Sequence, residues 1–186
     1  MNCERTRASA YRNLAFADME IPLADGQVML APRVEARLLQ ELGIRKTDKV
    51  LEVGTGSGYM AALLAHRAAH VLSLEIDADL TAQARKNLAQ EGISNVDVRH
   101  ADGVAGAAAD GPFDVIVLSG SVAEVPQALL TQLKVGGRLA AIVGDEPMMR
   151  ATVVTRSSDS SFTTTEPWDC NAPRLNGFTE PSRFAF

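Results

Sequence analysis

Three glycines at alternate positions, Gly54, Gly56 and Gly58, are the residues whose spacing most clearly indicates a binding site. They follow an apolar run of the kind that forms a buried strand, and they precede a stretch rich in helix formers. Glycine lets the backbone turn tightly and lets a ligand approach where a Cβ would collide. The next helix directs unpaired N–H groups at that ligand. The loop, which also contains Thr55 and Ser57, therefore predicts a site for a nucleotide-like molecule.

The spacing of these glycines discriminates between ligands. The dinucleotide fingerprint is G-x-G-x-x-G, and this chain has Tyr59 where that pattern requires its third glycine. Glu52 lies two positions before the first glycine, so the stretch resembles the first motif of class I S-adenosylmethionine-dependent methyltransferases, [DE]-x-G-x-G-x-G. A nicotinamide-dependent oxidoreductase and a turn that merely needs glycines stay open as alternatives.

Composition narrows the class of protein. The chain has 186 residues, which is the length of one domain, and 46% of them are hydrophobic. A net charge of −5 argues against a large nucleic-acid interface, which would need clustered Lys and Arg. No apolar run has the length of a membrane span, and no signal-peptide pattern is present. The two cysteines, Cys3 and Cys170, are expected to be reduced thiols in a cytoplasmic protein, and no Cys/His cluster has metal-ligand spacing.

Strand and helix patterns alternate along the chain. Strands are expected at 50–53, 70–76, 96–99, 113–118, 138–143, 151–155 and 162–168, and helices at 32–42, 60–67, 78–90 and 124–133. Asp77 is the expected N-cap of the third helix, and Gly43 and Gly92 are expected to end the first and third. Residues 21–28 predict a loop or a short hairpin, and Gly136-Gly137 predicts a turn into the fifth strand. The tail from residue 171 has too many Pro, Asn and Gly to predict an element.

This order predicts an α/β fold: a doubly wound, mostly parallel seven-stranded sheet with helices on both faces and a C-terminal antiparallel hairpin. Ligands of such Rossmann-like sheets bind beyond the carboxyl ends of the strands, near the switch point in strand order. Every residue that we consider for ligand binding follows a strand.

Four sequence blocks carry a more specific resemblance. From about Tyr11 to Glu146 the chain resembles the protein-L-isoaspartate O-methyltransferases. The blocks that carry it are Val50–Tyr59, Val96–Gly103, Pro112–Val117 and Leu129–Gly144. The closing Pro181–Phe186 is similar to the end of a bacterial branch of that family. The resemblance implies residues 1–30 as an N-terminal extension or cap and residues 31–186 as an S-adenosylmethionine-binding methyltransferase domain.

The resemblance also implies a set of residues that bind S-adenosylmethionine and its product S-adenosylhomocysteine. Glu52 and the glycine loop would line the methionine half, Glu75 would accept hydrogen bonds from both ribose hydroxyls, and Asp102 would meet the adenine amino group. The full set is Glu52, Gly54, Thr55, Gly56, Ser57, Gly58, Glu75, Ile76, Ala101, Asp102 and Gly103.

On the acceptor side the chain departs from the family. The family usually carries Ser-x-Pro-His before the first motif, whereas this chain reads Leu30-Ala31-Pro32-Arg33, and Ser119-Gly120-Ser121 stands where the family often has Thr-Ala-Ala. The implied reaction is transfer of a methyl group to the carboxylate of an isoaspartyl residue, which needs no general base because the carboxylate is already ionised. Arg33, Ser119 and Ser121 are the candidate donors to that carboxylate.

Several interpretations of function stay open at this point. The expected partners are isoaspartyl peptides or proteins, or a small-molecule acceptor if Leu30 lines an apolar pocket, and a homodimer is possible. No nucleic acid or membrane partner is expected. A cofactor-binding module without catalysis is the alternative from another class.

Overall fold

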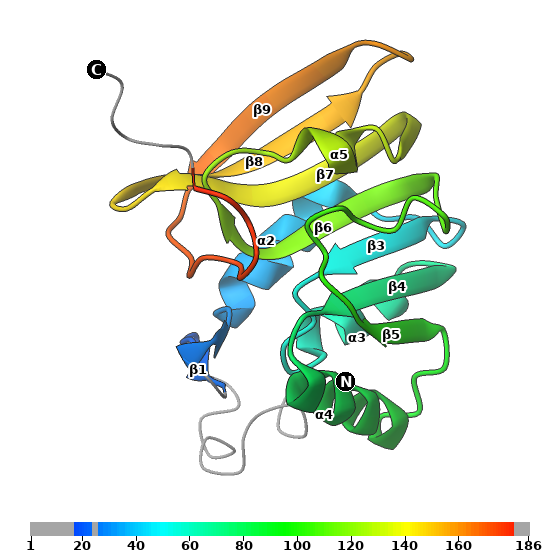
Figure 1. Cartoon of the computed structure of the whole chain (residues 1–186), viewed down its shortest axis with the longest axis vertical. Helices are drawn as coiled ribbons and strands as arrows, with labels where there is room; N and C mark the ends of the chain where they lie inside the picture. Colours follow the sequence, from blue (N-terminus) through cyan, green and yellow to red (C-terminus); the bar gives the residue numbers. More distant parts are fainter. Residues whose placement is uncertain (1–16, 24–25, 181–186) are drawn as a thin grey trace.

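A seven-stranded sheet forms the centre of the computed structural model, which describes residues 17–23 and 26–180 (Figure 1). The strand order is β5-β4-β3-β6-β7-β8-β9. The strands from β5 to β7 are parallel, whereas β8 and β9 are antiparallel to their neighbours. The strands are β3 (Lys49–Val53), β4 (His70–Glu75), β5 (Val96–His100), β6 (Phe113–Val122), β7 (Leu133–Asp145), β8 (Met148–Arg156) and β9 (Phe162–Asp169). The predicted fold class and the terminal hairpin are confirmed.

Side-chain alternation along the central strands builds a core on each face of the sheet. In β3, Val50 packs with helices α2 (Pro32–Leu42) and α3 (Tyr59–Ala65), while Leu51 and Val53 face the other side. Helix α4 (Ala78–Gln90) packs beside α3 and β5. The opposite face is covered by the four-residue helix α5 (Gln127–Leu130) and by irregular segments. The helices are therefore distributed unevenly between the two faces.

Local signals set the ends of these helices as predicted. Gly43 ends α2 in the left-handed conformation with φ of 50°, and the Asp77 carboxylate accepts the Leu80 backbone N–H at 2.8 Å at the start of α4. Gly92, with φ of 70°, follows the last turn of α4. Of the predicted loop or hairpin at residues 21–28, the hairpin is found: β1 (Ile21–Pro22) pairs with β2 (Val28–Met29).

One predicted helix is found in its expected place but is shorter than predicted. Residues 124–133 form only the short α5 after Pro126, and Leu133 belongs to β7, where it pairs with Phe113. The Gln132 side chain accepts the Ala107 N–H at 2.8 Å and donates to the Ala105 carbonyl at 2.7 Å. These long-range bonds hold the chain extended, so the helix cannot continue past its first turn.

The predicted Gly136-Gly137 turn lies within β7 rather than before it. The pairing of β7 with β6 jumps from Leu133 to Arg138, which leaves residues 134–137 as a bulge. A Cβ on Gly137 would lie 3.0 Å from the Asp114 carbonyl oxygen, so the close approach of the two strands requires glycine there.

No helix of the described ranges combines the length and apolar composition that crossing a bilayer requires. The N-terminal segment up to residue 16, with Cys3, and the closing residues 181–186 lie outside the described residues.

We expect Asp77→Ala to lower the free energy of unfolding by about 1 kcal/mol, because it removes the acceptor for the first turn of α4. Chemical denaturation measures this change. Asp159→Ala in the exposed β8–β9 turn is the matched control and should have almost no effect. Equal stabilities of the two variants would contradict the capping role of Asp77.

Candidate functional site

The carboxyl edge of the sheet brings together segments that are far apart in sequence. The chain leaves β3 into the glycine loop, leaves β4 at Glu75 and leaves β5 at Ala101, while Ser119 lies near the end of β6. The order of the strands reverses between β3 and β6, so the glycine loop lies at the switch point of the sheet. All of the predicted cofactor residues therefore lie along one edge.

The glycine loop needs its glycines for backbone conformation and for space. Gly54, Gly56 and Gly58 have φ values of 90°, 52° and 84°, which other residues rarely adopt. A Cβ on Gly58 would lie 3.3 Å from the Ala84 Cβ, so this glycine also lets α3 pack against α4. Gly103, from the loop after β5, is equally restricted, because its Cβ would lie 2.3 Å from the Val53 Cγ1.

Glu52 is buried below this loop and is held by hydroxyl groups. Ser73 on β4 donates to its Oε2 at 2.6 Å, and Ser119 on β6 donates to its Oε1 at 2.8 Å. Thr55 lies 2.6 Å from the Ser73 oxygen, and it must be the donor when the single proton of Ser73 points to Glu52. Glu52 thus ties three strands and the glycine loop into one network.

Burial in this position disfavours the charged form of Glu52. The carboxyl is fully buried, and its pKa is raised to about 7 by several causes together, of which burial is the largest. The hydrogen bonds from Ser73 and Ser119 lower the pKa part of the way back, and the negative charge of Glu75 raises it further. Glu52 therefore titrates close to neutral pH.

Glu75 is the second buried carboxylate, and it is bonded to the backbone. Its Oε2 accepts the Gly56 N–H at 2.7 Å, and its Oε1 accepts the Asp77 N–H at 3.1 Å. A carboxylate offers about four lone-pair sites, so two sites remain for the hydroxyls of a ligand. This arrangement fixes the carboxylate beside the glycine loop.

The loop after β5 completes this edge. Asp102 is exposed, and its Oδ1 accepts the Val104 N–H at 3.0 Å, which shapes the turn. Ile76 is 39% exposed, which is unusual for a large apolar residue in this chain. One side of this edge is formed by Ile76, which follows β4, and by Ala101, Asp102 and Gly103, which follow the neighbouring β5. Their contacts with an adenine ring stay a prediction.

On the acceptor side, the structure brings together only part of the predicted set. Ser119 lines a cavity of about 90 Å³ together with Leu30 and residues of the glycine loop. Ser121 is fully buried beside this cavity. Arg33 lies on the outer surface of α2, where it is 74% exposed and pairs with Asp18 at 3.3 Å, and it is not among the residues that line the cavity.

The same cavity is also lined by residues of the C-terminal segment, for which the sequence predicted no element and no role. They include Arg174, Leu175 and Asn176, which follow β9 and run back over the ends of the central strands (Figure 1, red). Arg174 is the cation among the residues that line this cavity. No periodic pattern marks these residues in the sequence, so no local signal identified them.

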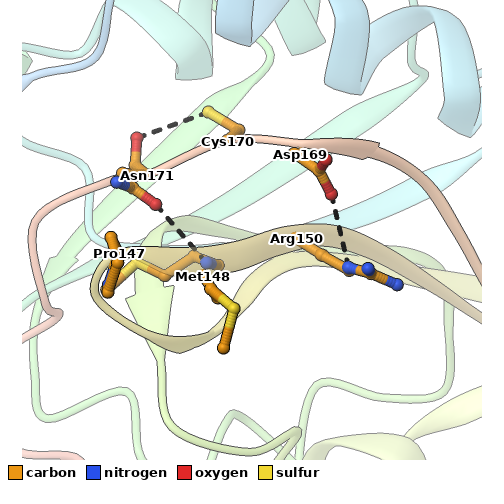
Figure 2. Close-up of a pocket in the computed structure, with 7 residues that line it drawn as sticks. Pro147, Met148, Arg150, Asp169, Cys170 and Asn171 are labelled. Carbon is orange, nitrogen blue, oxygen red and sulfur yellow. Dashed lines mark hydrogen bonds and ion pairs between the residues drawn. The ribbon is translucent and has the colours of Figure 1, made fainter.

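A larger hollow of about 390 Å³ lies at the β7–β8 turn (Figure 2). Its polar groups bind one another: Arg150 pairs with Asp169 at 3.3 Å, and the Cys170 thiol donates to the Asn171 carbonyl at 3.3 Å. Burial raises the pKa of Cys170, which disfavours a reactive thiolate. None of the predicted site residues lines this hollow, so the functional site is assigned to the glycine loop. In the described part of the chain, no group of three or more His, Cys, Asp or Glu side chains is arranged to hold a metal ion.

Sheet topology and the glycine loop at its switch point define a protein with the class I methyltransferase fold. A solved protein-L-isoaspartate O-methyltransferase superimposes with a TM-score of 0.85 at 24% identity, covering 95% of this chain and 59% of that one. A Plasmodium falciparum protein assigned as a beta-aspartate methyltransferase (PCMT), in complex with S-adenosyl-L-homocysteine, superimposes with a TM-score of 0.79 at 20% identity, covering 93% of this chain and 85% of that one.

The chain belongs to the protein-L-isoaspartate(D-aspartate) O-methyltransferase (PCMT) family, whose sequence model matches residues 2–171. A protein-L-isoaspartate O-methyltransferase of Methanoculleus marisnigri is 44% identical over 131 residues, which are 70% of this chain and 60% of that protein. One of Yersinia enterocolitica is 39% identical over 163 residues, which are 88% of this chain and 78% of that protein. The chain thus spans less than two thirds of the archaeal relative.

We expect the stability of the protein to fall as pH rises from 4.5 to 7, because folded Glu52 holds its proton over a range in which the unfolded chain has lost it. The stability that a raised carboxyl pKa contributes is fully present below the unfolded value of 4.5 and is lost as the pH rises through the folded value of about 7. The loss attributable to Glu52 is on the order of 3 kcal/mol. Denaturation across this range measures it.

Glu52→Gln removes the titration and should flatten the pH profile, whereas Glu41→Gln on the exposed face of α2 should leave the profile unchanged. A Glu52→Gln profile that keeps the slope of the unmodified protein would contradict a raised pKa at Glu52.

Proposed function

We propose that this chain is an S-adenosylmethionine-dependent methyltransferase that acts on the carboxylate of isoaspartyl residues in damaged proteins. The observation that carries the proposal is the Gly54–Gly58 loop bonded directly to the Glu75 carboxylate, at the switch point of a sheet from the PCMT family. The P. falciparum structure that shares this fold is in complex with S-adenosyl-L-homocysteine.

The residues present suit this cofactor. The glycine loop leaves room for a ligand beside its backbone that a Cβ would reduce, and the N–H groups in the first turn of α3 follow directly after it. Glu75 retains acceptor sites for ribose hydroxyls, and Ile76 offers an apolar surface for a ring. Glu52 adds negative charge below the loop when it is ionised, which suits a positively charged ligand.

S-adenosylmethionine supplies a methyl group on a positively charged sulfur, which is released as a neutral thioether when the methyl group is transferred. The chain contributes binding and alignment, which supply roughly 7–11 kcal/mol in well-oriented reactions. No residue has to remove a proton, because the acceptor carboxylate is ionised at neutral pH.

For the acceptor carboxylate we assign Arg174 as the cation, in place of the predicted Arg33. Arg174 lines the same cavity as Leu30, Ser119 and the glycine loop, whereas Arg33 does not. The Arg174 guanidinium is bound to Glu180 at 2.7 Å and to Asp145 at 2.6 Å, and its Nη1 donates to the Gly144 carbonyl, so it offers the acceptor its positive charge and the second Nη2 N–H rather than a free fork. Leu30 packs in an apolar cluster with Ile142 and Met149, and it offers no donor where the family usually has serine. A guanidinium compensates for that loss because it binds carboxylates through charge-assisted hydrogen bonds.

The test of function is the transfer of labelled methyl from S-adenosylmethionine to an isoaspartyl peptide, beside the same peptide with normal aspartate. We expect a methyl ester on the isoaspartyl peptide alone. Tight binding of S-adenosylhomocysteine with no methylation of the isoaspartyl peptide would contradict the proposed acceptor while leaving the cofactor site intact.

Glu75→Gln tests the cofactor site separately. We expect the affinity for S-adenosylhomocysteine, measured by calorimetry, to fall roughly 10- to 100-fold, because charge-assisted hydrogen bonds contribute about 1.5–3 kcal/mol each. Glu41→Gln is the control, and circular dichroism must show that both variants fold. An unchanged affinity in folded Glu75→Gln would exclude Glu75 from the site.

A further inference from the structure

The segment Pro173–Phe178, which we call the strap, crosses the carboxyl edge of the sheet. Two backbone hydrogen bonds attach its beginning to the end of β6: the Ser121 N–H donates to the Pro173 carbonyl at 2.8 Å, and the Leu175 N–H donates to the Ser121 carbonyl at 2.9 Å. Figure 1 shows the strap, in red, looping over the ends of the central strands. Beyond Leu175, no backbone hydrogen bond to the sheet is found for the described strap residues.

Arg174 anchors this beginning of the strap. Its Nη1 donates to the Gly144 carbonyl at 2.8 Å, and its Nη2 pairs with the Asp145 carboxylate at 2.6 Å, both at the end of β7. Its Nε donates to the Glu180 carboxylate at 2.7 Å, which holds a residue just beyond the far end of the strap close to the same anchor. The Arg174 side chain is only 24% exposed, so these bonds are largely shielded from water. The first two residues of the strap are therefore fixed to two strands.

The rest of the strap lies on residues that are predicted to bind the cofactor. A Cβ on Gly54 would lie 2.7 Å from the Leu175 Cδ2, and one on Gly120 would lie 2.8 Å from the same atom, so the Leu175 side chain rests directly on the glycine loop and on β6. Farther along, a Cβ on Gly177 would lie 3.3 Å from the Asp102 Oδ1 and 3.5 Å from the Ile76 Cδ1. The strap therefore covers both the methionine half and the adenine half of the predicted site.

The two cavities that described residues form under the strap are each small for such a ligand. The cavity beside Leu30 and Ser119 measures about 90 Å³, and the cavity enclosed by Glu75, Ile76, Gly103 and Phe178 measures about 20 Å³. Pockets that enclose ligands of this size hold roughly 300–1,000 Å³. The residues suit the cofactor, and a segment of the same chain fills the volume.

We infer that the part of the strap from Leu175 to Phe178 is displaceable. It competes with the cofactor for its crevice and swings away about the Arg174 anchor when the cofactor binds. The inference rests on the proposed function, because it takes the crevice to be the cofactor site. Leu175 and Phe178 are only partly buried, so opening exposes limited apolar surface. The apparent affinity is then the intrinsic affinity reduced by the open fraction.

The backbone amides of Leu175 in the strap and of Ser121 in β6 give an internal comparison. Amide hydrogen exchange, followed residue by residue by NMR, should show faster exchange at Leu175 when S-adenosylhomocysteine is added, because the bond to the Ser121 carbonyl breaks. The Ser121 amide should keep its protection, because Pro173 stays at the anchor. Unchanged or slower exchange at Leu175 in the saturated protein would overturn the inference and leave the proposed function standing.

Leu175→Ala tests the competition directly. It removes the side chain that lies on the glycine loop, so we expect S-adenosylhomocysteine to bind roughly tenfold more tightly. This factor corresponds to a closed state that is populated about ten times more than the open state in the unmodified chain. Leu175→Met, which keeps the volume, should bind as the unmodified chain does. Val135→Ala, at an exposed position in the β7 bulge, is the control for removal of an aliphatic side chain.

The outcomes separate the two proposals. Weaker binding by folded Leu175→Ala would show that Leu175 supports the cofactor rather than excludes it, and this would overturn the strap. Binding by Leu175→Ala but not by the unmodified chain would support the strap in its strongest form. Absence of binding by every variant would contradict the cofactor site and the strap together.

Discussion

Two carboxylates, Glu52 and Glu75, lie buried beneath one glycine loop, and the cost of burying them determines how the site is built. An isolated buried charge is destabilising by several kcal/mol, so each oxygen must find donors or keep a proton. Glu75 receives backbone N–H groups from Gly56 and Asp77, whereas Glu52 receives hydroxyl groups from Ser73 and Ser119. The hydrogen bond from the Gly56 N–H thus fixes the glycine loop and also satisfies one oxygen of the Glu75 carboxylate.

The parts of this arrangement that depend on local chemistry could be predicted from the sequence. The glycines follow from backbone conformation, the start of α4 follows from the Asp77 cap, and the central strands follow from their apolar runs. Parallel strands joined by helices leave few possible topologies, so the placement of Glu75 beside the glycine loop and of Asp102 at the same edge of the sheet also followed. These predictions needed no knowledge of distant contacts.

The parts that depend on distant contacts could not be predicted in this way. The helix expected at 124–133 is limited by the bonds of Gln132 to residues 105 and 107 and by the pairing of Leu133 with Phe113. Arg33 was a candidate because it lies where the family usually has Ser-x-Pro-His and can donate to a carboxylate, yet it pairs with Asp18 on the surface. Arg174 and Leu175 are brought to the crevice by an isolated β-bridge between Arg174 and Ser121. The tail contains Pro and Asn and has no periodic pattern, so the sequence does not indicate this path.

Ser119 connects the buried charge with the acceptor cavity, and this position has a chemical consequence. A serine hydroxyl has one proton, so while Ser119 donates to an ionised Glu52 it presents only lone pairs to the cavity. A carboxylate in this cavity cannot receive a hydrogen bond from Ser119 in that state. When Glu52 keeps its proton it can donate to Ser119, whose own proton becomes available to the acceptor. Because the pKa of Glu52 is about 7, both proton arrangements are populated near neutral pH. The protonation of Glu52 therefore decides whether Ser119 can donate into the cavity, although Glu52 itself does not line it.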